Sequence, residues 1–152
     1  MPKKSTTWVV VADGSSATIY ATTGPGEGLR RTAALRSDAA RKSTRALGTD
    51  RPGRTQSSAA GAARRAGLAP RADWHREAKR EFLERVAAAL DDGAKDKAFE
   101  RLVLVANARA LGDLRAALSA RVAKRIVGEL RKDLNKTPAR ELPEHLRKVM
   151  LV

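Results

Sequence analysis

Trp8-Val9-Val10-Val11-Ala12, followed by Asp13-Gly14-Ser15-Ser16, is the stretch that decides the fold. Its first five residues are all apolar, which is typical of a strand buried on both faces, and the Asp-Gly-Ser-Ser run predicts a tight turn after it. A second run of this kind, Leu102-Val103-Leu104-Val105-Ala106, lies in the last third of the chain. Two such strands predict a central sheet with helices on each side.

Two further strands are expected directly after the turn, in segments 17–22 and 29–36. In both segments, successive residues fall into two alternating sets, which is typical of strands with two different faces. The breaker Gly24-Pro25-Gly26 separates them. We therefore predict three consecutive antiparallel strands at the start of the chain.

A helix is predicted from Asp73, which is placed to cap it, to Asp92-Gly93, which should end it. Its apolar residues recur at every fourth position, which is typical of one buried helix face. They are Trp74, Ala78, Phe82, Val86 and Leu90. A second helix is expected after the strand 102–106, with Leu111, Leu114, Ala117 and Leu118 on one stripe.

The segment 119–134 fits a helix or a strand, and we favour an edge strand from Ile126 to Arg131. Gly128 weakens a helix more than an edge strand, and the basic residues after it suit an edge protected from aggregation. Further on, Thr137-Pro138 and Pro143 each resemble a helix start. The C-terminal helix is expected at 143–150.

These elements predict one α/β domain over residues 1–152. A chain of 152 residues is long enough for one core. The expected architecture is a five-stranded mixed sheet in the order 3-2-1-4-5, covered by helices and resembling the ribonuclease-H-like plan.

A long basic loop, residues 38–72, is expected between the third strand and the first helix. It is rich in Gly, Ser, Ala and Arg and shows no helical or strand periodicity. Residues 36–71 hold nine Arg or Lys and two Asp, a net charge of +7 out of +14 for the whole chain. The segment is either a solvated linker or an arm that contacts phosphates. The candidate phosphate-contacting residues are Arg41, Lys42, Arg45, Arg51, Arg54, Arg64 and Arg65.

Within this loop, Pro52-Gly53 predicts a turn with Arg51 and Arg54 on either side, which suits a clamp for one phosphate. The Gly-Lys-Ser/Thr ending of a Walker loop is absent.

The net charge of +14 predicts a polyanionic partner such as RNA, DNA or an anionic membrane. Aromatic residues make up only 3% of the chain, which argues against a protein that binds single strands by stacking bases. The chain has no cysteine, no signal-like segment and no run long enough to span a membrane, so we expect a cytoplasmic location.

Few residues suggest catalysis or metal binding, and we expect no metal and no cofactor. Asp13, at a strand end, could belong to an acidic metal site, but Asp-Gly is more typical of a turn. His75 and Glu77 do not share a helix face, and the sequence indicates no third ligand for them.

Five blocks of the sequence together resemble the bacterial host-attachment protein family. They are residues 8–14, 47–54, 99–106, 111–115 and 132–134, and the most specific is Asp50-Arg51-Pro52-Gly53-Arg54 within the second. The resemblance implies a protein required for attachment to host cells. It also implies a fold similar to the middle domain of archaeal and eukaryotic peptide-chain release factors.

In those release factors the long loop ends in Gly-Gly-Gln, which enters the peptidyl-transferase centre of the ribosome. Here the corresponding segment 57–65 reads Ser-Ser-Ala-Ala-Gly-Ala-Ala-Arg-Arg, without Gly-Gly-Gln. Peptide release is therefore not expected, whereas a basic loop suited to ribosomal RNA remains.

Three functions follow as hypotheses. The first is a non-enzymatic RNA-binding protein, associated with the ribosome, that contacts phosphates through its basic loop. The second is an attachment protein that binds an anionic glycan or lipid at a surface. The third is a metal-dependent nuclease that uses Asp13. The oligomeric state stays open.

Overall fold

The computed structural model describes residues 5–40 and 61–150, with residues 61–72 described by their backbone alone. Its centre is a five-stranded sheet in the order β3-β2-β1-β4-β5. The strands are β1 (Thr7–Ala12), β2 (Ser16–Thr22), β3 (Arg30–Arg36), β4 (Arg101–Ala106) and β5 (Ile126–Leu130). Strand β1 is antiparallel to β2 and β2 to β3, whereas β1 is parallel to β4 and β4 to β5. The predicted fold class, mixed sheet and strand order are confirmed.

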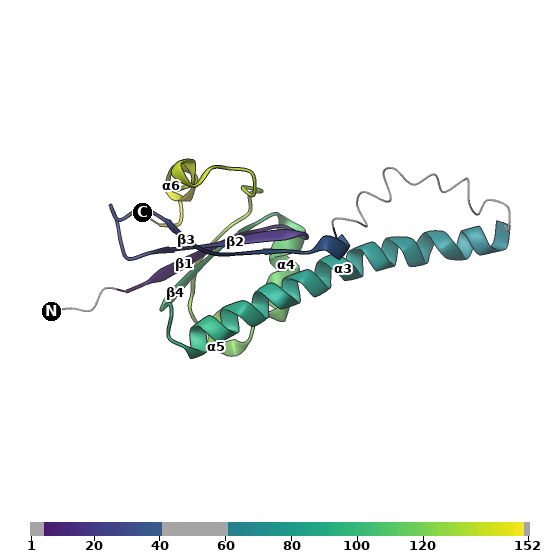
Figure 1. Cartoon of the computed structure of the whole chain (residues 1–152), viewed down its shortest axis with the longest axis horizontal. Coiled ribbons are helices and arrows are strands. Elements are labelled where there is room, and N and C mark those ends of the chain that lie inside the picture. Colours follow the sequence, from purple (N-terminus) through teal and green to yellow (C-terminus); the bar gives the residue numbers. More distant parts are fainter. Residues whose placement is uncertain (1–4, 41–60, 151–152) are drawn as a thin grey trace.

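Helices lie on both sides of this sheet, so the fold has three layers (Figure 1). The helices are α3 (Gly61–Lys95), α4 (Ala108–Ala117), α5 (Ala120–Ala123), the 3-10 helix η1 (Ala139–Glu141) and α6 (Leu142–Leu146). Helices α3, α4 and α5 cover one face, and α6 lies on the other (Figure 1).

The two faces of β1 and β4 are buried in two separate hydrophobic clusters. Val10 and Leu104 face α3 and α4 and lie in a cluster with Phe82 and Leu114. Alternate residues of the same strands, such as Val103, face the opposite way and pack with Leu142 and Leu146 of α6, among others. Because successive strand residues point to opposite faces, burial on both sides requires an apolar residue at every position.

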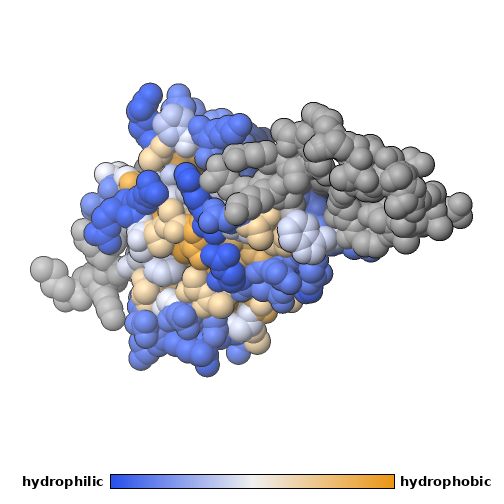
Figure 2. All heavy atoms as spheres, turned by 45° about the vertical axis from the view of Figure 1, so that its right-hand side comes forward, coloured by the Kyte–Doolittle hydropathy of each residue, from blue (hydrophilic) through white to orange (hydrophobic). Residues whose placement is uncertain are grey.

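Both ends of the sheet are edge strands, and the ambiguous segment 119–134 contains one of them. Residues 120–123 form α5, capped by Ser119, and Ile126–Leu130 then forms β5, so the favoured edge strand is confirmed. Val127 on β5 is 56% exposed, and β3 is exposed along almost all its length. Figure 2 shows one face of the molecule, on which hydrophilic residues surround a smaller hydrophobic area.

The start of α3 differs from the prediction. The helix begins at Gly61 rather than at Asp73, and residues 38–40 are helical as well. Of the predicted loop 38–72, residues 38–40 and 61–72 are thus helical, and its centre, residues 41–60, lies outside the described residues. Three of residues 61–66 are Ala and two are Arg, and alanine and arginine both have high helix propensity. This composition outweighs Gly67 and Pro70, which had suggested a loop.

The end of α3 also differs, because the helix continues through Asp92-Gly93 to Lys95. Gly93 serves packing instead of ending the helix. A Cβ atom at this position would lie 2.6 Å from Cη2 of Trp8, whose ring stacks on Phe99 with centroids 4.6 Å apart. A glycine is needed where the Trp8 ring approaches the helix backbone.

Two smaller predictions are corrected at Trp74 and at the C-terminal helix. Trp74 is 57% exposed, although Ala78, one turn later on the same stripe, is buried. The N-terminal half of α3 extends beyond the sheet (Figure 1), so no strand of the sheet covers the stripe there. Helix α6 spans Leu142–Leu146 instead of 143–150, and the amides of Val149 and Met150 both donate to the Leu146 carbonyl in a closing turn.

Candidate functional site

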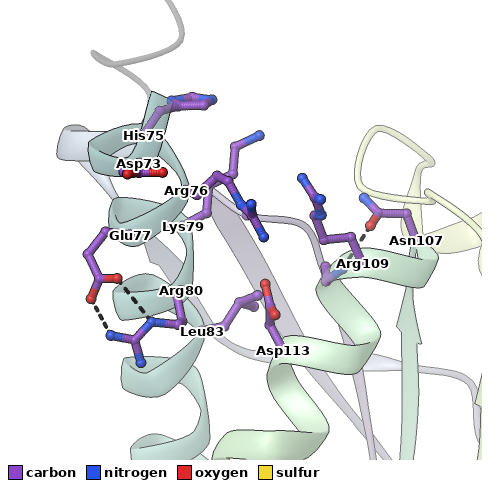
Figure 3. A pocket seen from close by; sticks show the side chains of 12 residues that line it. Asp73, His75, Arg76, Glu77, Lys79, Arg80, Leu83, Asn107, Arg109 and Asp113 are labelled. Atoms are coloured by element: carbon purple, nitrogen blue, oxygen red, sulfur yellow. Dashed lines mark hydrogen bonds and ion pairs between the residues drawn. The ribbon is translucent and has the colours of Figure 1, made fainter. Parts of the chain in front are cut away.

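A cleft of about 350 Å³ lies between α3 and the first turns of α4 (Figure 3). Leu83 of α3 and Ala110 of α4 are both buried and contribute apolar lining. Most of the other lining residues are charged. They come from segment 73–80 of α3 and from α4. A pocket of this size is within the range that small ligands occupy in proteins.

The cleft lies at the carboxyl ends of the two central parallel strands. Gly14 follows β1 and Asn107 follows β4, and both line the cleft. In open α/β sheets, ligands bind in the crevice outside the carboxyl ends of the strands. The position of the cleft in the fold is therefore the usual one for a binding site.

Helix α4 begins directly at the cleft. Its N-cap residue is Asn107, whose Oδ1 accepts a hydrogen bond from the Ala110 amide at 2.9 Å. The unpaired amides of a helix N-terminus carry a partial positive charge. This end of α4 therefore adds to the positive potential of the cleft.

Three cationic side chains from two helices point into the same space. Arg76 and Lys79 project from α3, and Arg109 projects from the first turn of α4 (Figure 3). Among the described residues, none of the three forms an ion pair within 4.0 Å. Arg80, in contrast, pairs with Glu77 and Glu84 along α3 (Figure 3 shows Glu77). The three cations of the cleft are thus not held in ion pairs by the described carboxylates, although Asp73, Glu77 and Asp113 also line the cleft.

Lys79 is positioned by the turn that follows β1. A Cβ atom added at Gly14 would lie 2.7 Å from Cγ and Cδ of Lys79, so the lysine stem rests directly against the glycine backbone. The absence of a side chain at residue 14 allows this close approach. The Asp13-Gly14 turn therefore supports the lysine stem beside the cleft.

The cleft also contains groups whose pKa is lowered. The hydrogen bond from Arg80 lowers the pKa of Glu77, so this carboxylate stays ionised and engaged with its partner. Burial and the charge of Lys79 lower the pKa of His75, which favours the neutral imidazole. Asp113 is half-buried on α4 and faces the same space as the three cations (Figure 3).

The Asp13 carboxylate forms hydrogen bonds within the turn that follows β1, as the sequence predicted. Its Oδ1 accepts hydrogen bonds from the amides of Ser15 and Ser16 at 2.7 and 2.8 Å. Burial acts to raise the pKa of Asp13, but these hydrogen bonds outweigh it, and the pKa is lowered from its ordinary value of 3.8. The described part of the chain holds no group of three or more His, Cys, Asp or Glu that could bind a metal ion.

We predict that Asp13→Ala lowers the free energy of unfolding at pH 7 by roughly 2 kcal/mol, because two amides lose a charged acceptor. A lowered pKa means that the ionised carboxylate stabilises the fold above about pH 4 and that this stabilisation is lost as the pH falls through the folded-state pKa. Urea unfolding between pH 7 and pH 3 measures both effects. The difference from wild type should shrink at the acidic end, and exposed Asp96→Ala is the control.

The predicted phosphate-contacting residues are not part of the described cleft. Arg41, Lys42, Arg45, Arg51 and Arg54 lie outside the described residues, and Arg64 and Arg65 lie on α3, where side chains are not described. The cleft cations were missed in the sequence. The available signal was the spacing of Arg76, Lys79 and Leu83 on one side of the predicted helix, together with Arg109 just after a buried strand.

The chain matches a family model over residues 8–146, and that family is described as "Protein required for attachment to host cells". The chain belongs to this family. The resemblance carried by the sequence blocks is thereby confirmed. No curated protein matches this host-attachment family member in sequence.

A solved structure, that of an archaeal protein, is similar to this family member in fold. The TM-score is 0.50 at 13% sequence identity, and the match covers 95% of the chain described here but 34% of the archaeal chain. The chain thus spans about a third of the length of the archaeal protein. At this identity the similarity concerns the fold alone.

Proposed function

We propose that this protein is a non-enzymatic RNA-binding protein, associated with the ribosome. RNA phosphates bind in the cleft between α3 and α4 and along the basic segment that carries Arg41, Lys42, Arg45, Arg51, Arg54, Arg64 and Arg65. The observation that carries the proposal is the convergence of Arg76, Lys79 and Arg109 on one cleft without an ion pair to a described carboxylate.

The chemistry of these cations fits phosphate. Arg presents several N–H donors in a planar fork, and Lys supplies a compact charge, so the three side chains can surround phosphate oxygens from different sides. Leu83 and Ala110 add apolar lining beside these cations. The net charge of +14 adds a long-range attraction for a polyanion over a small one.

We predict a steep salt dependence of RNA binding. If each cleft cation neutralises one phosphate, the cleft alone contributes a log-log slope of roughly −2 on single-stranded RNA, at about −0.7 per contact. Lys79→Gln and Arg109→Gln should each flatten the slope by about 0.7, whereas Lys148→Gln, exposed in the C-terminal segment, should not. Fluorescence anisotropy over a salt series measures the slope. A slope that none of the variants changes contradicts a role for the cleft.

Association with the ribosome is tested by pulling the protein from a cell lysate at low salt and analysing the copurified RNA. Ribosomal RNA should be the main species recovered with wild type, and less of it with Lys79→Gln. The same RNA incubated with the protein and Mg²⁺ should stay intact, because the proposed function includes no cleavage. Progressive cleavage would instead favour the nuclease hypothesis.

A second candidate function is attachment through an anionic glycan or lipid, and the description of the family favours it. The same cations would then bind a sulfate, carboxylate or lipid phosphate. In the described part of the chain, no helix is long and apolar enough to cross a membrane. Binding to heparin or to vesicles containing phosphatidylserine, without binding to RNA, would favour this candidate.

A further inference from the structure

Asp113 places a negative charge beside the three cations that converge on the cleft. It lies one helical turn after Arg109 on α4, so the two side chains share a helix face. Nevertheless, the Asp113 side chain forms no hydrogen bond or ion pair with any other described residue. The carboxylate faces the space that Arg76, Lys79 and Arg109 surround (Figure 3).

A carboxylate in this position repels a simple phosphate ion, so a ligand bound there needs more than negative charge. An ionised carboxylate only accepts hydrogen bonds. The fitting ligand therefore presents a hydrogen-bond donor close to its phosphate. In RNA, every nucleotide carries such a donor, the ribose 2′-hydroxyl, and DNA lacks it.

We infer that Asp113 accepts a hydrogen bond from the ribose 2′-hydroxyl of a nucleotide whose phosphate is bound by Arg76, Lys79 and Arg109, so that the cleft selects RNA over DNA. This inference rests on the proposed function and specifies how that site distinguishes its ligand. Recognition through ribose and phosphate is independent of base sequence. Leu83 and Ala110 contribute apolar lining to the same cleft.

The test compares single-stranded RNA, DNA and 2′-O-methyl RNA of one sequence, titrated by fluorescence anisotropy against wild type, Asp113→Ala and Asp92→Ala. Asp92 is exposed near the other end of α3, so its removal changes the net charge equally without touching the cleft. Removing Asp113 takes away both repulsion and the acceptor. DNA should therefore bind more tightly to Asp113→Ala, while RNA loses its hydrogen bond.

Wild type should prefer RNA to both DNA and 2′-O-methyl RNA, and Asp113→Ala should reduce the RNA-to-DNA affinity ratio about tenfold, the effect of one hydrogen bond to a charged group. Asp92→Ala should leave the ratio unchanged. If wild type binds RNA but Asp113→Ala raises both affinities by the same factor, Asp113 acts only through its charge and the inference is overturned while the proposed function stands. If wild type binds neither nucleic acid, both are overturned.

Discussion

Leu104→Asp is expected to prevent cooperative folding. Leu104 is completely buried at the centre of the sheet, in β4 between Val10 of β1 and Glu129 of β5. An aspartate there leaves a carboxylate among apolar side chains without a partner and costs several kcal/mol, against a total stability of about 5–15 kcal/mol for a typical domain. Circular dichroism during heating should show no sharp transition, or one at a much lower temperature.

The matched control is Val127→Asp. It introduces the same group into the neighbouring strand β5, where Val127 is 56% exposed. Surface substitutions usually change stability by less than about 0.5 kcal/mol. A melting temperature of Leu104→Asp close to that of wild type would contradict the burial of β4 on both faces.

The double reversal Lys79→Glu and Arg109→Glu is expected to weaken RNA binding at least a hundredfold at physiological salt. Each substitution removes a charge-assisted hydrogen bond worth about 1.5–3 kcal/mol and adds repulsion between the carboxylate and phosphates. Both side chains point into the cleft from different helices (Figure 3), so their effects combine at one site. Anisotropy titrations with single-stranded RNA, and copurification of ribosomal RNA, measure the loss.

A control with the same change in net charge is Arg140→Glu together with Lys148→Glu, both exposed in the C-terminal segment. It should lose only the part of the affinity that depends on overall charge. Equal losses in both double variants would show that long-range attraction, and not the cleft, determines binding.

The strands could be predicted from the sequence because their patterns are local. The continuous apolar runs 8–12 and 102–106 indicated strands buried on both faces, and both clusters that bury them are present. The turn at Asp13 was also predictable, since the amides that donate to its carboxylate belong to Ser15 and Ser16, two and three residues along the chain. For these features, nearby residues contain all the necessary information.

The cleft and the extent of α3 could not be predicted in this way. Arg76 and Arg109 lie far apart in sequence and meet only because α3 packs beside α4. Gly93 suggested the end of a helix, because the residues next to it in the sequence do not indicate its contact with Trp8. The same holds for Trp74, whose spacing predicted burial, although the sheet does not reach that part of the helix.

The parallel pairing of β1 with β4 has a consequence for how the protein is made. A nascent chain completes β1, β2 and β3 early, but the partner on the other side of β1 begins only at Arg101. At about 5–20 residues per second, several seconds pass before β4 is synthesised. During this interval the apolar β1 has an unpaired edge, so truncated chains that end before Arg101 should aggregate or recruit chaperones.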